Sequence, residues 1–321
     1  MSESAETLAA ARAGNQKAFE TLVAPYRREL RAHCYRMSGS THDAEDLLQD
    51  SLVKAWKGLS GFEGRSSLRG WLYRVATSAC LNALEQRKNR VLPDVLHGAS
   101  TPGTAMQPQP EVPWLEPIPD EWIEPEEHSP EARYSRRQSV SLAFLTALQT
   151  LPPRQRAVLL LRDVLGWQAS ECAELLDLSV AAVNSALQRA RSTLEESKAV
   201  RPSVPEDEET RSLLKRYIDA WEQSDVGLLV ALLKEDAVLT MPPMPVWFHG
   251  AAHIGEAIAG MVLVPGSKGT FRCEAARANG QPAFTMFQKN AAGAWDAVGV
   301  HVLTVEGGRV ARLDAFLGAK V

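Results

Sequence analysis

Hydrophobic residues recur at helical spacing through most of the first 200 residues. The pattern is clearest in residues 18–37, 42–59 and 67–88, and again in a pair of segments that begins at Leu151. Apolar side chains three and four positions apart lie on one face of a helix. These stretches therefore predict amphipathic helices that pack their apolar faces together, so the first two folded parts of the chain are predicted to be all-α.

The pattern changes after residue 208. The predicted helices there lie at about 208–223, 225–234 and 251–260, and strand-like runs follow at 270–278, 282–288, 295–305 and 309–317. Glu306-Gly307-Gly308, between the last two runs, is typical of a hairpin turn. Helices followed by an antiparallel sheet predict an α+β layer fold.

Two stretches rich in proline and acid interrupt these patterns. Residues 91–132 contain no Lys or Arg, nine acids and nine of the chain's 19 prolines. Because proline disfavours helix, this stretch predicts an extended acidic connector, with a disordered tether as the alternative. A second break follows at 201–209. The predicted organisation is therefore a helical domain, a linker, a second helical domain and an α+β domain, at 1–92, 93–132, 133–200 and 208–321.

Composition narrows the class of protein. The chain has 321 residues, of which 45% are hydrophobic, and a formal net charge of −4. No stretch approaches the roughly 18 apolar residues of a membrane span, and the N-terminus lacks the basic-then-apolar pattern of a secretion signal. We therefore expect a cytoplasmic protein with no membrane partner. The four cysteines form no CxxC pair, so we expect them to be buried, with neither a disulfide framework nor a metal site.

An acidic face distinguishes the helix predicted near Asp43–Lys57. Ala44, Leu48, Leu52 and Ala55 share one side of it, whereas three carboxylates share the opposite side, those of Asp43, Asp46 and Asp50. Such a stripe is suited to docking a partner. It is equally the composition of an ordinary solvated face near a helix N-terminus, where the helix dipole favours acids.

The helix predicted from about Leu68 to Arg87 is basic and carries an aromatic side chain on its outward face. The residues on that face are Trp71, Arg74, Ser78 and Asn82. An aromatic ring can stack on an unpaired base while an arginine holds phosphate, and the preceding small and polar residues 61–67 are suited to cupping a flipped base. The alternative is that Trp71 packs against a neighbouring helix or against this loop.

Residues 169–191 have the pattern of a helix-turn-helix. A short helix at Ala169–Leu176 is followed by a tight turn, with Ser179 as N-cap of a second helix at Val180–Arg191. The inner face of the second helix is predicted to be Val180, Val183, Leu187 and Ala190. Its outer face carries small and amide side chains that suit base edges in a major groove, with Arg191 near the backbone. Generic helical hairpins can share this pattern.

Three ordered motifs resemble the extracytoplasmic-function (ECF) sigma factors, a branch of the sigma-70 family of RNA polymerase subunits. The motifs are DAEDLLQDSLVKAW, then FEGRSSLRGWLYRVATSACLNAL, then LPPRQRAVLLLRDVLGWQASECAELLDLSVAAVNSALQRARSTL. The resemblance implies that the partners are core RNA polymerase, through its β′ clamp and β flap, and promoter DNA. It also implies that the linker threads through the polymerase.

The resemblance assigns roles to individual residues of this sequence. The residues that would contact the polymerase are Asp43, Asp46, Gln49 and Asp50. Those that would read the minus-ten element are Arg65, Ser66, Arg69, Trp71, Arg74, Ser78 and Asn82. Those that would read the minus-thirty-five element are Ser179, Ala181, Asn184, Ser185, Gln188, Arg189 and Arg191. The family often has Asn where Ser78 stands, which implies a different minus-ten contact here.

The last segment resembles the SnoaL-like α+β domain, a cone that curves around an apolar pocket, through YIDAWEQSD, VWFHGAAHIGEAI and HVLTVEGGRV. The resemblance implies regulation of the sigma factor in cis. The candidate pocket residues are Tyr217, Trp221, Met241, Trp247, His253, Asn279, His301 and Asp314. Acid–base catalysis by His301 and Asp314, ligand sensing and a purely structural contact all stay open.

The prediction is therefore a promoter-specificity subunit that is not an enzyme and has no cofactor. The alternative is a one-component DNA-binding regulator, or a small-molecule enzyme, with a SnoaL-like ligand pocket. That alternative predicts tight binding to duplex DNA without polymerase.

Overall fold

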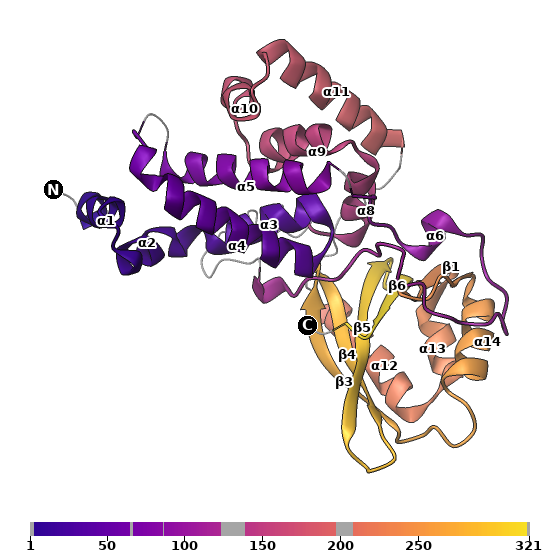
Figure 1. The fold of residues 1–321 in the computed structure, drawn as a ribbon. Helices are drawn as coiled ribbons and strands as arrows, with labels where there is room; N and C mark the ends of the chain where they lie inside the picture. The colour runs from indigo at the N-terminus through magenta and orange to yellow at the C-terminus, as the bar shows by residue number, and fades with distance from the viewer. Residues whose placement is uncertain (1–2, 65–66, 86, 123–138, 197–207, 320–321) are drawn as a thin grey trace. The chain divides into compact units, whose positions relative to one another are not determined.

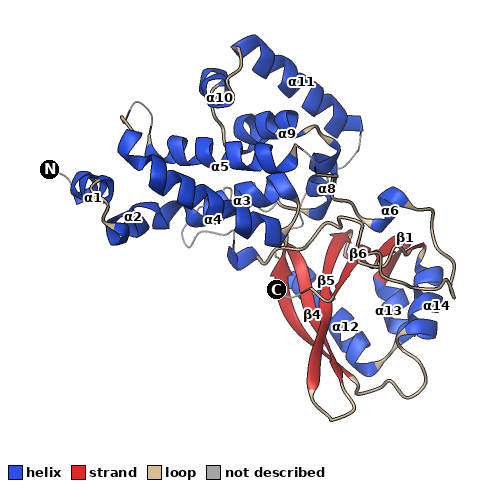
Figure 2. Cartoon of the chain, in the orientation of Figure 1, coloured by secondary structure: helices blue, strands red, loops and turns tan. Residues whose placement is uncertain are grey.

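The computed structural model describes residues 3–64, 67–85, 87–122, 139–196 and 208–319 (Figure 1). The chain forms two compact units. Unit 1 is built mainly from Met1–Asn89 and Ala147–Val200, and unit 2 mainly from Arg90–Asp120 and Arg201–Val321. The helical first part and the α+β last part agree with the predicted fold classes (Figure 2).

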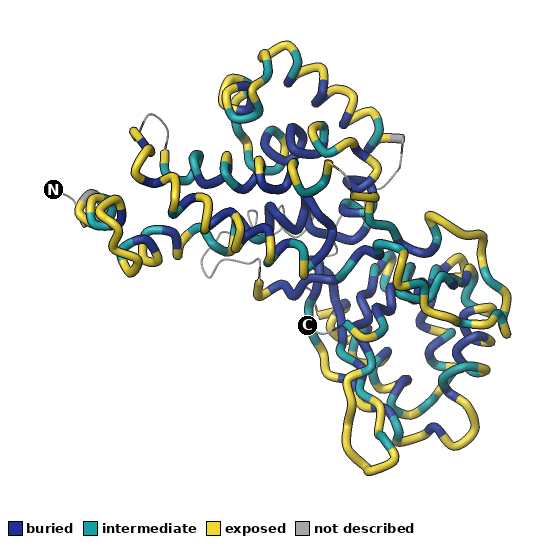
Figure 3. Tube along the Cα trace, in the orientation of Figure 1, coloured by how far each residue is buried: buried dark blue, intermediate teal, exposed yellow. Residues whose placement is uncertain are grey.

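The N-terminal part of unit 1 is a helical bundle. Its helices are α1 (Glu3–Arg12), α2 (Gln16–Val23), α3 (Arg27–Ser38), α4 (Thr41–Gly58) and α5 (Leu68–Leu84). Side-chain caps fix three of the starts, because Asn15, Ser40 and Ser67 each accept a hydrogen bond from a backbone N–H in the first turn. Gly39, with φ of 73°, ends α3 in the left-handed conformation. The packed faces are buried along α3, α4 and α5 (Figure 3).

The remaining helices of unit 1 contain the predicted helix-turn-helix. They are α9 (Pro153–Leu159), a π-helical turn (Leu160–Val164), α10 (Ala169–Leu176) and α11 (Val180–Glu196). Asp177 is left-handed, with φ of 54°, and closes α10, while the Ser179 hydroxyl accepts from the backbone N–H of Ala182. Helix α8 (Leu142–Thr150) precedes this group and is divided between the two units.

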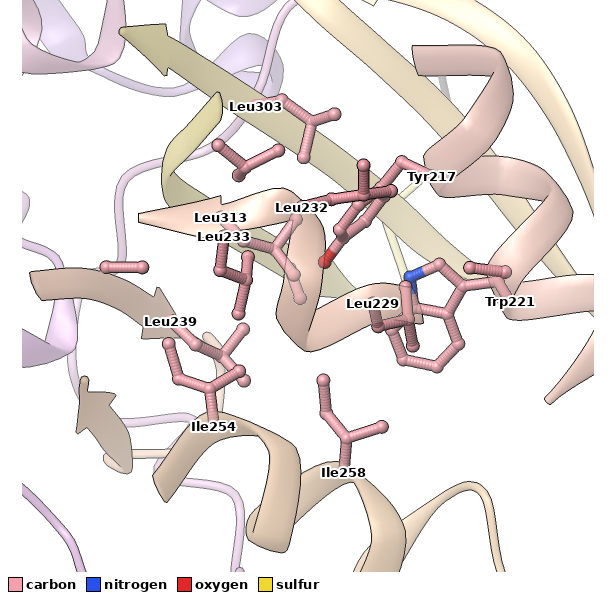
Figure 4. Packing of buried hydrophobic residues seen from close by; sticks show 14 of the residues in the cluster. Tyr217, Trp221, Leu229, Leu232, Leu233, Leu239, Ile254, Ile258, Leu303 and Leu313 are labelled. Carbon is pink, nitrogen blue, oxygen red and sulfur yellow. The ribbon is translucent and has the colours of Figure 1, made fainter. Parts of the chain in front are cut away.

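The described part of unit 2 after residue 207 consists of a six-stranded sheet and three helices, and α6 (Pro93–Leu96) lies in its linker part. The helices are α12 (Glu208–Gln223), α13 (Val226–Leu232) and α14 (Ala251–Met261). The strands are β1 (Leu233–Thr240), β2 (Trp247–His249), β3 (Phe271–Ala278), β4 (Gln281–Lys289), β5 (Trp295–Glu306) and β6 (Arg309–Leu317). Their order is β2-β1-β6-β5-β4-β3. The core between helices and sheet includes Tyr217, Trp221 and Leu313 (Figure 4).

Two features of this sheet differ from the sequence prediction. Strands β1 and β2 were not predicted, and β1 pairs in parallel with β6, so the sheet is mixed rather than antiparallel. The helix predicted to end near residue 234 ends at Leu232 and passes directly into β1. Leu233, Ala237 and Leu239 are buried along this strand. The polar residues 234–236 interrupt the alternation of apolar and polar positions by which a strand is recognised in a sequence.

No helix among the described residues combines the length and hydropathy that crossing a bilayer requires. All four cysteines are buried, as their sequence context predicted, and their thiols are free. Within the described ranges, no group of three His, Cys, Asp or Glu side chains is placed to hold a metal ion.

Candidate functional site: two DNA-facing helices, a docked linker and an apolar cavity

The acidic face of α4 is partly exposed and partly covered. Asp46, Gln49 and Asp50 are exposed, together with the apolar Val53 one turn further on. Asp43 differs, because its side chain is only 13% exposed and pairs with Arg87 at 2.8 Å. The surface available to a partner is therefore centred on Asp46 and Asp50 rather than on all three carboxylates.

Helix α5 exposes Arg74, Ser78 and Asn82, as its pattern predicted. Trp71 is only half-buried and packs on Phe62 of the preceding loop, with ring centroids 5.2 Å apart, which is the packing alternative considered above. Arg69 is engaged by Glu29 through bonds of 2.7 and 3.0 Å, and this carboxylate raises the pKa of the guanidinium. Arg65 and Ser66 lie outside the described residues.

Helix α5 meets α10 and the residues just before it within unit 1. The exposed Arg74 donates from Nη2 to Glu174 Oε1 of α10 at 2.9 Å. The buried Tyr73 packs edge-on against Trp167, which precedes α10, with ring centroids 5.6 Å apart. A polar cavity of about 570 Å³ lies at this contact, lined by Arg69, Arg74 and Glu174 among others. A proposed DNA-contacting arginine thus has a carboxylate where a phosphate would bind.

The outer face of α11 is open. Ala181, Asn184, Ser185, Gln188 and Arg189 are all exposed, while Val183, Ala186, Leu187 and Ala190 are buried beneath them. That list corrects the predicted inner face in one position: Val180 is 45% exposed, because it lies in the first turn before the helix reaches its packing partners. Arg189 donates to the Ser185 hydroxyl, and Arg191 pairs with Asp163 at 2.7 Å.

Arg156 was not singled out from the sequence, yet it is among the largest fully buried side chains of the described residues. Its guanidinium donates to Gln149 Oε1 at 2.8 Å and to the backbone oxygens of Met37, Gln149 and Leu151. These acceptors carry no net charge. Burial therefore lowers the pKa of Arg156 to about 10.

The first part of the linker is docked on unit 2 rather than free. Arg312 of β6 forms two hydrogen bonds with Asp94, of 2.6 and 3.0 Å, and also contacts the fully buried Asp314 at 2.9 Å. Thr240 donates to the same Asp314 at 2.7 Å. Burial alone would lower the pKa of Arg312, but Asp314 and Asp94 raise it above its ordinary value.

The β3–β4 turn holds the other end of this segment. The carboxylate of Asp120 accepts from Arg277 at 3.0 Å and from the backbone N–H of Gly280 at 2.7 Å. Asn279, left-handed at φ of 57°, accepts from the backbone N–H of Ile118 and donates to the carbonyl of Val140. One side chain therefore bridges both sides of the interval 123–138, a role that its sequence context did not reveal.

An apolar cavity of about 240 Å³ lies in unit 2. Trp221 and His301 line it, and their rings meet edge to face at 5.7 Å. Tyr217 lies beside them in the core, with its hydroxyl directed toward the Trp221 indole (Figure 4), and burial raises its pKa. The buried Nδ1 atom of His301 has no hydrogen-bond partner among the described residues, and burial lowers the pKa of this histidine to about 3.

The other predicted pocket residues lie elsewhere, except Met241, which lines the cavity. His301 pairs across the sheet with Ala315, whereas Asp314 pairs with Val302, so the two side chains leave opposite faces and cannot act together as acid and base. Trp247 donates to the linker carbonyl of His97, and His253 is exposed. A sequence without strand register could not place these side chains.

Comparisons with known proteins agree with this arrangement. Residues 22–90 match the sigma-70 region 2 family, 141–194 match sigma-70 region 4, and 214–313 match the SnoaL-like domain family. The ECF RNA polymerase sigma factor SigG of Mycobacterium tuberculosis is 47% identical over 93% of this chain and 81% of its own length.

Two further relatives were found. The ECF RNA polymerase sigma factor SigW of Bacillus subtilis is 28% identical over 56% of this chain and 89% of its own. The crystal structure of the extracytoplasmic function sigma factor SigJ of M. tuberculosis matches with a TM-score of 0.59 at 21% identity, covering 91% of this chain and 93% of that one. Such relatives are transcription initiation factors rather than enzymes. The chain carries sigma-70 regions 2 and 4 followed by a SnoaL-like domain, and it belongs to the ECF RNA polymerase sigma factors.

Proposed function

We propose that this protein binds core RNA polymerase in the cytoplasm and directs it to specific promoters, with the SnoaL-like domain modulating that activity in cis. The observation that carries the proposal is the outer face of α11. Its exposed amide, hydroxyl and guanidinium groups, above a buried apolar face, suit a helix that reads base edges in a major groove.

The polymerase contact is assigned to α4. Asp46, Gln49 and Asp50 form an exposed acidic patch beside the apolar Val53, and the β′ clamp is the proposed partner. An apolar side chain such as Val53 amid polar ones is typical of the centre of a protein interface. The β flap is the proposed partner of the region that contains α11.

The two DNA-reading helices must separate for this function. The minus-ten and minus-thirty-five elements lie about 25 base pairs apart, which is about 85 Å of duplex at 3.4 Å per pair. In the described arrangement α5 contacts α10, the helix that precedes α11, through Arg74 and Glu174. These neighbours cannot span both elements, so we propose that the contact opens when polymerase and DNA bind.

Control in cis is assigned to the docked linker. Asp94 and Asp120 tie residues 90–120 to unit 2, and Asn279 reaches both Ile118 and Val140. Because this linker joins the two promoter-reading regions, a domain that holds it affects how far those regions can move apart. The direction of the effect on transcription is left to experiment.

The test compares polymerase-dependent transcription with binding to DNA alone. Core polymerase with this protein is expected to give promoter-dependent transcripts, whereas the protein alone is expected to shift duplex promoter DNA poorly. Asp46→Lys should reduce transcription through weaker polymerase binding, while Glu20→Lys, on the exposed surface of α2, serves as the charge-matched control. Tight duplex binding without polymerase, and no promoter-dependent transcript, would instead support the one-component regulator.

A further inference from the structure

Trp122 occupies an exposed position on the helical bundle of unit 1. It ends the short 3₁₀ turn Asp120–Trp122, and the chain passes at Glu121 from unit 2 into unit 1. Trp122 is 36% exposed, and the Arg31 guanidinium of α3 lies 5.2 Å from the centroid of its ring. A cation over an indole is attracted to the π electrons of the ring. The linker therefore fixes a large aromatic side chain on the surface of the bundle without covering it.

Arg31 connects this indole to the acidic face of α4. Its Nε donates to Glu45 Oε2 at 2.9 Å, and Gln49 Nε2 donates to Glu45 Oε1 at 2.8 Å. Burial raises the pKa of the Glu45 carboxyl, but the hydrogen bonds from Gln49 and Arg31 outweigh that effect and lower it below its ordinary value, so the carboxylate is charged at pH 7. Residues three apart are neighbours on a helix surface, which places Gln49 beside Asp46. The indole and the exposed acidic patch of α4 thus belong to neighbouring rows of one surface.

The side chains of this surface indicate the chemistry of its partner. Asp46 and Asp50 are exposed carboxylates that attract Arg and Lys, and the indole of Trp122 attracts the same cations as well as apolar groups. Tryptophan and arginine are enriched among the interface residues that contribute most of the binding energy. Nucleic acid does not fit, because the carboxylates repel phosphate. The partner that fits is a protein surface with basic side chains among apolar ones.

We propose that Trp122, held by Arg31, extends the polymerase-docking surface of α4, and that a basic and partly apolar surface of core RNA polymerase contacts this linker residue together with the acidic patch. The inference rests on the proposed function, which assigns the polymerase contact to α4. Asp120, two residues before Trp122, is held by Arg277 of unit 2 at 3.0 Å. Polymerase therefore contacts the linker directly after the point where the SnoaL-like domain binds it.

The test is the affinity of the full chain for core polymerase without DNA, measured by surface plasmon resonance. We expect Trp122→Ala to weaken binding by about tenfold or more, as truncation of an important interface tryptophan does. Trp122→Phe keeps an aromatic ring beside Arg31 and should recover most of the affinity. The matched control is Trp295→Ala, which should leave the affinity unchanged. Trp295 is also 36% exposed and lies 5.4 Å from the Arg272 guanidinium, but it belongs to unit 2.

Asp46→Lys separates this inference from the proposed function. If Asp46→Lys weakens polymerase binding while Trp122→Ala does not, the inference is wrong and the assignment of α4 stands. If neither variant weakens binding, the assignment of α4 is wrong as well. Tighter binding by Trp122→Ala would show that the indole covers the docking surface, and an equal loss in Trp295→Ala would show a general effect; either result overturns the proposal. Thermal unfolding checks that each variant is folded.

Discussion

Two arginines hold distant segments of this protein, and they do so in opposite ways: Arg156 is fully buried, whereas Arg312 is partly buried. Arg156 in unit 1 is surrounded by carbonyl and amide oxygens that carry no charge, whereas Arg312 in unit 2 lies between Asp94 and Asp314. Burial lowers the pKa of Arg156 to about 10, while the two carboxylates raise that of Arg312. Burying a charge without a counter-charge costs free energy. The contacts that Arg156 makes in unit 1 should therefore break more easily than those of Arg312 with Asp94.

This difference bears on the proposed function. Under that proposal the contacts of α5 with α10 break so that both promoter elements can be read, and they include the exposed ion pair of Arg74 with Glu174. The contacts of Arg312 with Asp94 are not required to break. We therefore expect the contacts in unit 1 to open on DNA and those of Arg312 to persist.

Substitution of Arg312 should give the largest loss of stability. Arg312→Met leaves the fully buried Asp314 with Thr240 as its remaining polar contact, and we expect unit 2 to lose about 3–5 kcal/mol of stability. Hydrogen exchange of the β1 and β6 amides measures this. Arg309→Met, at an exposed position of the same strand, is the control. Equal protection from hydrogen exchange in the two variants would show that the contacts of Arg312 with Asp94 and Asp314 contribute little to stability.

Acid should destabilise both units alike, because each contains a buried neutral histidine. Burial lowers the pKa of His33 and of His301 to about 3, against 6.5 for an exposed histidine. The unfolded chain therefore takes up a proton below pH 6.5 that the folded chain does not. Each histidine's contribution is complete above pH 6.5 and falls by about 1.4 kcal/mol per pH unit toward pH 3.

The variant His301→Phe isolates that effect in unit 2. Amide exchange measured at pH 6.5 and at pH 4.5 should show a smaller acid sensitivity in the sheet than the wild type has, with the bundle around His33 unchanged. A sheet that remains as acid-sensitive in this variant would assign the loss to other groups.

A carboxylate placed beside Arg156 should strengthen the contacts that this arginine makes in unit 1. Gln149→Glu places a carboxylate where the amide oxygen now accepts from Arg156 at 2.8 Å, and we expect unit 1 to gain about 2 kcal/mol. If the contacts of Arg156 must break during initiation, transcription with core polymerase should fall at the same time. Full transcription by a stabilised Gln149→Glu protein would show that these contacts need not break.

The smallest expected effect comes from the exposed contact of α10 with α5. Glu174→Gln removes an ion pair whose side chains are 45% and 74% exposed, worth at most about 1 kcal/mol. It also frees Arg74 for DNA, so promoter binding by the polymerase complex should improve by no more than about fivefold. Asp163→Gln, which frees Arg191 at the other end of the motif, provides the comparison.

The sequence was sufficient where function follows from the periodicity of one element. The spacing in 169–191 located both helices of the helix-turn-helix, and the exposed face of α11 carries every residue predicted for it. It was insufficient where function depends on contacts between distant segments. Arg156, Arg312 and Asn279 have ordinary neighbours in the sequence, and only the fold brings them to Met37, Asp94 and Ile118.

Register explains the remaining errors. The pattern of β5 and β6 identified both strands, but the side on which each residue emerges depends on pairing that a single sequence does not give. His301 faces the cavity with Ala315, and Asp314 faces Arg312 on the other side. The linker's acids raised a similar difficulty: their composition predicted an extended connector, but it did not predict that Arg312 binds Asp94 or that Arg277 binds Asp120.

We propose that α5 and α11 separate when the protein engages polymerase and promoter. Lys57 on α4 and Glu195 on α11 are exposed and outside the proposed contacts, and all four native cysteines are buried, so cysteines introduced there can carry spin labels. The interlabel distance is measured by pulsed electron resonance for the free protein and for its complex with core polymerase and promoter DNA. We expect a short distance in the free protein that lengthens by tens of ångströms in the complex, toward the spacing of the two elements. The same distance in both states, in a complex that transcribes, would contradict the proposed separation of α5 and α11.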